Sequence, residues 1–149
     1  MCYQRLNGGK NIMIEVHDIV FCLNATNEVG RGASAHQVFS TMNPEYIPGL
    51  FSFSTVITLL GIDSLREHKI MLTLKREDDQ EVVVAKLEGM LPIIEELENL
   101  PDEIKGVNLA VGWNNINFTN EGMYRLSVFV DEMLIDGKSI YVKGKNQNG

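Results

Sequence analysis

The chain has 149 residues, of which 44% are hydrophobic and 22% are charged, as is usual for a folded globular protein. A chain of this length typically buries about 70% of the surface that it exposes when unfolded, so we expect one domain with a self-sufficient core. The 13 basic and 20 acidic residues give a net charge of −7, and no basic cluster that could meet a phosphate backbone is visible beyond Lys138, Lys143 and Lys145. Nucleic acid is therefore excluded as the expected partner.

The cysteines and the apolar runs bear on the compartment. Cys2 and Cys22 are too few for a disulfide framework, and we expect Cys22 to pack as a small hydrophobe. No apolar run reaches the roughly 20 residues that span a bilayer, and the first residues lack the apolar centre of a signal peptide. We expect a cytoplasmic protein that makes no membrane contact.

The first 12 residues differ from the rest of the chain. Residues 1–11 are polar and aperiodic, whereas strand-like alternation begins at Ile12, and a second methionine, Met13, stands at that boundary. We therefore expect residues 1–12 to be a non-native or flexible extension, with Met13 as the natural start. Residues 13–149 should form the single domain.

The first part of the domain predicts a strand followed by a loop. Residues 12–23 alternate and then become continuously apolar, which predicts one or two strands, with a kink at Val16-His17-Asp18. Asn24–Ser34 is dense in Asn, Gly and Ser, which predicts a loop. Pro44 and Pro48 then force turns, because the residue before a proline avoids helical geometry.

The middle of the chain predicts a long strand and a hairpin. In Leu50–Ile62 the phenylalanines share one parity and most hydroxyl side chains the other, which predicts a strand with its aromatic face in the core. His68–Arg76 alternates in the same way, and Glu81–Ala85 follows a polar turn as its partner.

A departure from the β pattern follows. In Glu88–Gly106 apolar residues recur every third position and Pro101 can end a helix, so we expect one short helix. Val107–Phe118 alternates again, but its parity slips after Trp113, which predicts a bulge near Asn114-Asn115.

The C-terminal segment carries the strongest alternation of the chain. Tyr124, Leu126, Val128 and Val130 share one parity, and Asp136-Gly137 is a preferred two-residue turn, so a β-hairpin is expected. Together these elements predict an all-β fold: a two-sheet antiparallel sandwich of the immunoglobulin-like or Greek-key type. We expect seven or eight strands with one short peripheral helix.

No pattern for catalysis or metal binding is complete. The histidines are His17, His36 and His68, without ligand spacing, so we expect no metal and no cofactor. Gly30-Arg31-Gly32 could present backbone N–H groups and a guanidinium to an anion, with His36 as a base. A mobile loop is the plainer interpretation of these residues.

Trp113 and Asn114 form a second candidate. The predicted bulge would place a tryptophan beside an amide, a combination that could line a ligand pocket or a protein interface. Packing of Trp113 in the core is the favoured alternative.

From Ile19 to Gly144 the order of features resembles an uncharacterised family of short bacterial and phage-encoded β-sandwich proteins. The resemblance lies in three stretches, IPGLFSFSTVITL, HKIMLTLKREDDQEVV and GMYRLSVFVDEMLIDGKSIYV. It departs most in 24–36 and 88–105. The resemblance implies the sandwich fold and a phage or prophage gene, and it assigns no activity.

The absence of any complete catalytic pattern favours a non-enzymatic binding module. We expect its partner to be a protein or a small ligand, with a host protein or a phage particle as the setting, and we expect a homo-oligomer formed through exposed strand edges. The alternative is a small-ligand-binding or hydrolytic protein that uses the Asn24–His36 loop.

Overall fold

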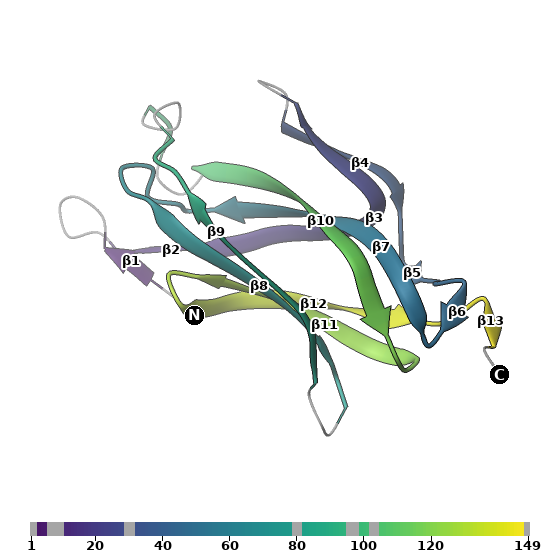
Figure 1. The fold of residues 1–149 in the computed structure, drawn as a ribbon. Helices are drawn as coiled ribbons and strands as arrows, with labels where there is room; N and C mark the ends of the chain where they lie inside the picture. The colour runs from purple at the N-terminus through teal and green to yellow at the C-terminus, as the bar shows by residue number, and fades with distance from the viewer. Residues whose placement is uncertain are drawn as a thin grey trace.

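The computed structural model describes residues 3–5, 11–28, 32–78, 82–94, 99–101 and 105–147. Within this part the chain forms two β-sheets that face each other, with no helix (Figure 1). The all-β two-sheet sandwich predicted from the sequence is confirmed.

One sheet has four strands and the other has five. The first sheet has the order β10 (Gly106–Phe118), β7 (Gly49–Leu60), β3 (Glu15–Glu28) and β4 (Gly32–Val38), and all of its neighbours are antiparallel. The second has the order β5 (Thr41–Met42), β12 (Met133–Val142), β11 (Gly122–Val130), β8 (His68–Arg76) and β9 (Val83–Leu91); β5 is its parallel member. Two small pairs join β1 (Tyr3–Arg5) to β2 (Asn11–Met13) and β6 (Tyr46–Ile47) to β13 (Asn146–Gln147).

The chain crosses between the sheets three times after β7. It passes from β7 to the β8–β9 hairpin, returns to β10, and crosses again to the β11–β12 hairpin. β9 and β10 are consequently consecutive in the chain but belong to different sheets, and each is the last strand of its sheet. Two free strand edges therefore lie on the same side of the sandwich.

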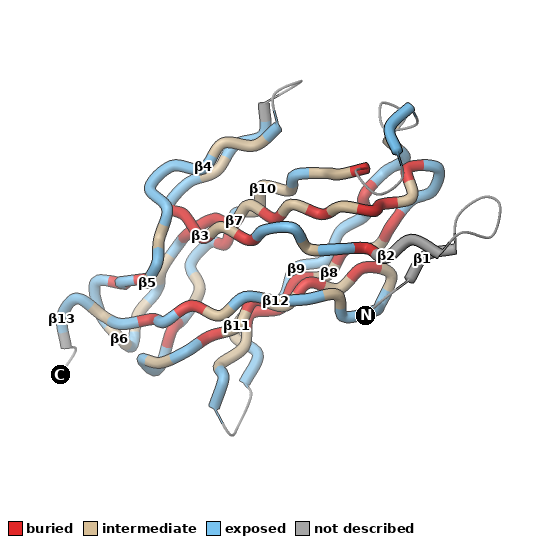
Figure 2. Tube along the Cα trace, turned by 180° about the vertical axis from the view of Figure 1, so that it is seen from behind, coloured by how far each residue is buried: buried red, intermediate tan, exposed pale blue. Residues whose placement is uncertain are grey.

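The core forms where the alternating apolar faces meet, as the buried segments in Figure 2 show. Aromatic rings fill its middle, with neighbouring centroids 5.1 to 6.4 Å apart, a separation typical of favourable ring packing. The rings belong to Phe21, Phe53, Trp113, Phe118 and Tyr124, each exposed by 2% or less. The prediction that the phenylalanines of the long strand point inward is confirmed for Phe53, and Phe51 packs partly buried against the core.

The start of β11 is fastened by a buried tyrosine. The Tyr124 hydroxyl donates a hydrogen bond of 2.6 Å to the carbonyl oxygen of Asn120, four residues upstream. This is the tyrosine-corner arrangement of Greek-key sandwiches. Burial raises the pKa of Tyr124, so the hydroxyl keeps its proton.

Both predicted strand irregularities are present. The register of β10 against β7 shifts between Trp113 and Ile116, with Asn115 at a φ of 54°, which confirms the bulge. The register of β3 against β7 shifts between Val16 and Asp18, where the kink was expected.

The loop expected at Asn24–Ser34 is largely strand. Asn24 pairs with His36, and the ladder continues to Glu28 and Gly32. Residues 29–31, between the two strands, lie outside the described residues. The amino-acid composition predicted a loop because these residues have low strand propensity. Backbone hydrogen bonds to the neighbouring strand nevertheless keep them in the sheet.

The prediction of a helix at Glu88–Gly106 is wrong for the first residues of this range. Glu88–Leu91 are the last residues of β9, and Leu91 is opposite His68 on β8. The remaining described residues of this range before β10 form no helix either, while 95–98 and 102–104 lie outside the described part. Sheet pairing overrides the three-residue spacing because Leu91 is buried in the sandwich.

The C-terminal hairpin is confirmed, but its turn lies elsewhere. Val130 pairs with Met133, and Asp131 and Glu132 between them have φ values of 50° and 70°, as a type I′ turn requires. Gly137 instead lies within β12, where an added Cβ would be 2.5 Å from the carbonyl oxygen of Leu126. The glycine permits close strand approach rather than a turn.

Candidate functional site

The structure separates the site residues predicted from the sequence. Arg31 lies outside the described residues. His36 is exposed on β4, and β3 and β7 stand between that strand and β10, which carries Trp113 and Asn114. The Asn114 side chain is exposed, whereas Trp113 points into the core. These residues line no common pocket in the described part of the chain.

Trp113 has the packing role that the sequence favoured. Its ring stacks on Phe53 at a centroid distance of 5.9 Å and an interplanar angle of 9°. Its indole N–H donates to the Thr55 hydroxyl at 3.1 Å, which satisfies the one polar group that the ring buries. With 1% of its surface exposed, Trp113 offers nothing to a ligand.

Cys22 also packs as predicted. The side chain is fully buried, and its thiol contacts the carbonyl oxygen of Ser54 at 3.5 Å. Burial raises the pKa of the Cys22 thiol, while hydrogen bonds with the backbone of His36 and Asn24 oppose that rise. The thiol therefore stays protonated and unreactive.

A polar cluster surrounds the β11–β12 turn. Asp131 accepts hydrogen bonds from the backbone N–H of Lys69 at 3.0 Å and from His68 Nδ1 at 2.8 Å, and Arg66 approaches it at 3.3 Å. His68 Nε2 lies 2.7 Å from the carbonyl oxygen of Asp63. Both ring nitrogens of His68 thus lie within hydrogen-bond distance of oxygen atoms.

This cluster joins the β11–β12 turn to the start of β8, and its histidine is inaccessible to a substrate. Partial burial acts to raise the pKa of Asp131, but the hydrogen bonds from His68 and Lys69, with the positive charges of His68 and Arg66, bring it below its ordinary value. The His68 side chain is 0% exposed, so a substrate cannot reach it. Among the described residues no group of His, Cys, Asp and Glu is arranged to hold a metal ion.

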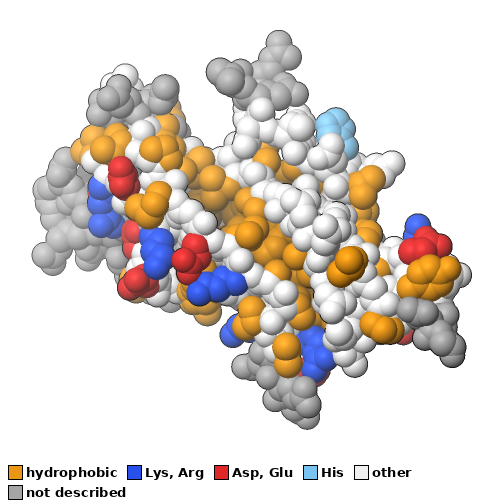
Figure 3. Space-filling view, viewed as in Figure 1, with side chains coloured by type: hydrophobic (Ala, Val, Ile, Leu, Met, Phe, Trp, Pro, Cys, Tyr) orange, Lys and Arg blue, Asp and Glu red, His pale blue; other side chains and the backbone are white. Residues whose placement is uncertain are grey.

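Within the described part of the chain, a surface depression lies between the edge strands β9 and β10. We call it the β9–β10 groove: a space of about 320 Å³ lined by Asn27, Ile70, Leu72, Leu87, Glu88, Gly89, Met90, Leu91, Leu109, Ala110 and Val111. Figure 3 shows hydrophobic side chains gathered in the hollowed centre of this face. The polar side chains in the lining are Asn27 and Glu88.

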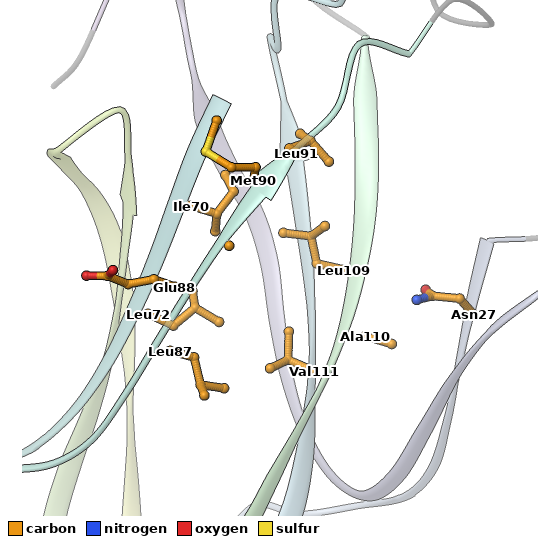
Figure 4. Close-up of a pocket in the computed structure, with 11 residues that line it drawn as sticks. Asn27, Ile70, Leu72, Leu87, Glu88, Met90, Leu91, Leu109, Ala110 and Val111 are labelled. Atoms are coloured by element: carbon orange, nitrogen blue, oxygen red, sulfur yellow. The ribbon is translucent and has the colours of Figure 1, made fainter. Parts of the chain in front are cut away.

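The walls of the groove come from both sheets. In Figure 4, Leu109 and Val111 point from β10 toward β9, while the Glu88 carboxylate points away from the space. The buried side chains of Ile70 and Leu72 on β8 form the floor, and Leu87 on β9 is opposite Leu72. On the rim Leu87 and Met90 are exposed by 38% and 61%, a large apolar exposure for side chains on one edge strand.

The sequence contained a signal for this groove that the helix prediction obscured. Val83, Ala85, Leu87, Gly89 and Leu91 continue a period of two, which would have extended the predicted strand to its observed end. Reading that alternation through Gly89 would have identified β9. The position of β10 across from it required the tertiary structure.

In that part of the chain which the structure describes, no helix has the length and apolar character needed to cross a membrane.

Three solved structures show a partial likeness to this fold. An alkylpurine DNA glycosylase of Pseudomonas fluorescens, solved with DNA containing an abasic site analogue, aligns over 89% of this chain with 8% identity and a TM-score of 0.48. An immunoglobulin-like protein of Pseudomonas aeruginosa aligns over 87% of this chain and 96% of its own, with 17% identity and a TM-score of 0.41. A β-glucosidase of Listeria innocua in complex with glucose aligns over 91% of this chain, with 11% identity and a TM-score of 0.44.

The chain spans 31% of the glycosylase and 17% of the β-glucosidase. No protein of curated function matches the sequence. A family model does match residues 17–143, which confirms the expectation of a family without assigned activity. The chain belongs to this family of unknown function, DUF6941.

Proposed function

We propose that the protein is a non-enzymatic binding module that takes an extended segment of another polypeptide into the β9–β10 groove. The observation that carries this proposal is an apolar groove flanked by two free strand edges. An unpaired edge presents backbone N–H and C=O groups to an added strand, and pockets beside it accept alternate side chains.

The chemistry of the lining supports binding of an apolar segment. The lining includes leucines on both sides, and the carboxylate of Glu88 faces away from the space. Burying apolar surface contributes about 25 cal/mol per Å², whereas selecting a charged small molecule would need convergent charges. Main-chain hydrogen bonds would set the orientation of the segment, and the leucines would select its apolar side chains.

The alternative, a small-ligand-binding or hydrolytic protein that uses residues 24–36, has less support. His36 is exposed on an edge strand while Trp113 is buried, so the described residues supply no shared pocket for this chemistry.

Peptides selected from a displayed random library test the groove. We expect Val111→Lys, which places a charge in the lining, to weaken their binding by at least about tenfold, or 1.4 kcal/mol. Leu134→Lys is the matched control, because Leu134 is exposed by 54% on β12 and does not line the groove. Equal urea midpoints for both variants and wild type would show that folding is intact.

Amide hydrogen exchange gives the second measurement. Strand addition should slow exchange at the outer edge of β9 or β10 and leave β4 unchanged. Peptides that bind Val111→Lys as tightly as wild type, or that protect β4 instead, would contradict the proposal.

We also propose a setting, on the strength of the sequence resemblance: a phage or prophage product that meets a host protein or another protein of a phage particle in the cytoplasm. The buried free thiol of Cys22 is compatible with a reducing compartment. Neighbouring genes test this setting, since virion genes would favour a particle and small early genes a host target. Neighbours of neither kind would remove the phage part of the proposal.

A further inference from the structure

The outer edge of β9 is long and carries apolar side chains on both sides of a central charged pair, Lys86 and Glu88. The strand covers nine residues, pairs with β8 along one side, and ends the five-stranded sheet on the other. Val83, Leu87 and Met90 on this strand are each exposed by more than a third. Strand edges are templates for another strand. β9 contains no proline, its lysine is followed two residues later by a glutamate, and the register shift in its pairing with β8 lies near its start, at Val84.

We propose that the β9 edge of the groove is covered by a second copy of this chain, with β9 of one copy pairing antiparallel to β9 of the other about a two-fold axis at Leu87. This deepens the proposed function, on which it rests, by naming the partner. Leu87 is the central residue of Val83–Leu91, so an axis there gives the longest overlap of the two strands. The two five-stranded sheets would then form one continuous sheet, as in isologous dimers.

Charge complementarity selects this register. Lys86 and Glu88 flank Leu87, and their side chains share one face of β9, with Nζ 3.0 Å from Oε1. The two-fold axis at Leu87 places Lys86 of each copy opposite Glu88 of the other, so the two ion pairs become a network of four alternating charges. Opposite charges directly across a strand pair stabilise it, and like charges destabilise it.

Neighbouring registers are disfavoured by the same residues. An axis at Lys86 would place the two lysines opposite each other, and an axis at Glu88 would do the same with the two carboxylates. The register centred on Leu87 is thus the one among these three that avoids a like-charged central pair.

The apolar residues fit the same arrangement. Leu87 of one copy would meet Leu87 of the other beside their grooves, and Gly89 would face Ala85, a pair that leaves room because nothing lies within 4 Å of the Cβ position of Gly89. Met90, the most exposed of the large hydrophobic side chains on β9, would pack on Val84. Pairing would therefore cover the apolar rim that an isolated subunit exposes.

Charge reversal tests the register. Lys86→Glu and Glu88→Lys each convert both cross-strand pairs into like-charged pairs, so each should weaken self-association about tenfold. Both side chains are about half exposed, so neither change should disturb the folded subunit. Sedimentation velocity over a micromolar concentration series measures the association. Lys143→Glu and Glu132→Lys are the matched controls, since they reverse exposed charges on other elements.

Two combinations are diagnostic of the proposed pairing. The double variant Lys86→Glu/Glu88→Lys restores opposite charges across the axis, so it should dimerise like wild type. An equal mixture of the two single variants should form a heterodimer, because the chain with two acidic residues then faces the chain with two basic residues. A dimer formed through another surface would show neither rescue.

A wild-type protein that remains monomeric throughout the series would overturn the self-pairing, and so would a dimer that is indifferent to both single reversals. Selected peptides that bind the wild-type monomer in the groove would, in that case, still uphold the proposed function and identify a different polypeptide as the partner. Loss of both self-association and peptide binding would overturn the two proposals together.

Discussion

Asp131→Ala should be among the most damaging single changes outside the core, because the carboxylate joins the β11–β12 turn to the start of β8. The substitution removes hydrogen bonds to His68 Nδ1 and to the N–H of Lys69, at 2.8 and 3.0 Å. A hydrogen bond to a charged group contributes about 1.5 to 3 kcal/mol, and we take the lower value because Asp131 is 32% exposed. The expected loss in the free energy of unfolding is about 3 kcal/mol.

The dependence of this loss on pH follows from the lowered pKa of Asp131. A carboxyl group whose pKa is lower in the folded protein contributes stability above its unfolded pKa, about 3.9, and that stability disappears as the pH falls through the folded pKa. The difference between wild type and Asp131→Ala should therefore be complete at pH 7 and shrink below about pH 4. The charged neighbours that hold Asp131 ionised are Arg66 and His68.

Urea unfolding at several pH values measures the difference, and thermal unfolding at pH 7 should show a Tm lowered by about 6 to 12 °C. Glu132→Ala is the matched control, because Glu132 shares the turn and the positive φ but makes only an exposed ion pair with Lys69 at 3.6 Å. It should change stability by less than about 1 kcal/mol. Equal losses for the two variants, or a difference that persists undiminished in acid, would refute the reasoning.

Two further changes probe the sandwich itself. Tyr124→Phe should lower the free energy of unfolding by about 1 to 2 kcal/mol in urea titrations, because it removes the buried 2.6 Å hydrogen bond to the carbonyl oxygen of Asn120. Tyr141→Phe is the control and should be nearly neutral, because the Tyr141 side chain is 43% exposed. Equal effects of the two substitutions would contradict this account. Gly137→Ala should lower the free energy of unfolding by about 1 to 3 kcal/mol, because the added Cβ would lie 2.5 Å from the Leu126 carbonyl oxygen. Gly112→Ala should lower it by less than about 1 kcal/mol, because the space at its Cβ position is open. If thermal unfolding gave the reverse order, close strand approach would not be the reason for Gly137.

Alternation in the sequence predicted most of the sandwich, because side chains on a strand have a period of two and one face must be buried. The parities of Phe53 and Tyr124 indicated the core face of each strand, and the slip after Trp113 indicated the bulge. The predicted start at Met13 and the cytoplasmic location stay predictions, since strand geometry bears on neither.

The errors occurred where local composition and tertiary pairing disagree. Residues 24–28 are polar enough for a loop, yet they form a ladder with β4. Asp136-Gly137 has the composition of a turn, but the chain turns at Asp131-Glu132, where contacts with His68 and Lys69 from another hairpin stabilise the left-handed residues. Such contacts join residues more than 60 positions apart, which no local pattern records.

By itself the sequence determined the layered architecture, the core faces and the absence of any complete catalytic pattern, because these depend on the order of apolar and polar residues along single strands. Only the tertiary structure decided where the strand edges lie. The groove exists because β9 and β10, each last in its own sheet, end on the same side of the sandwich. That placement depends on how the two sheets stack, and it also separated His36 from Trp113.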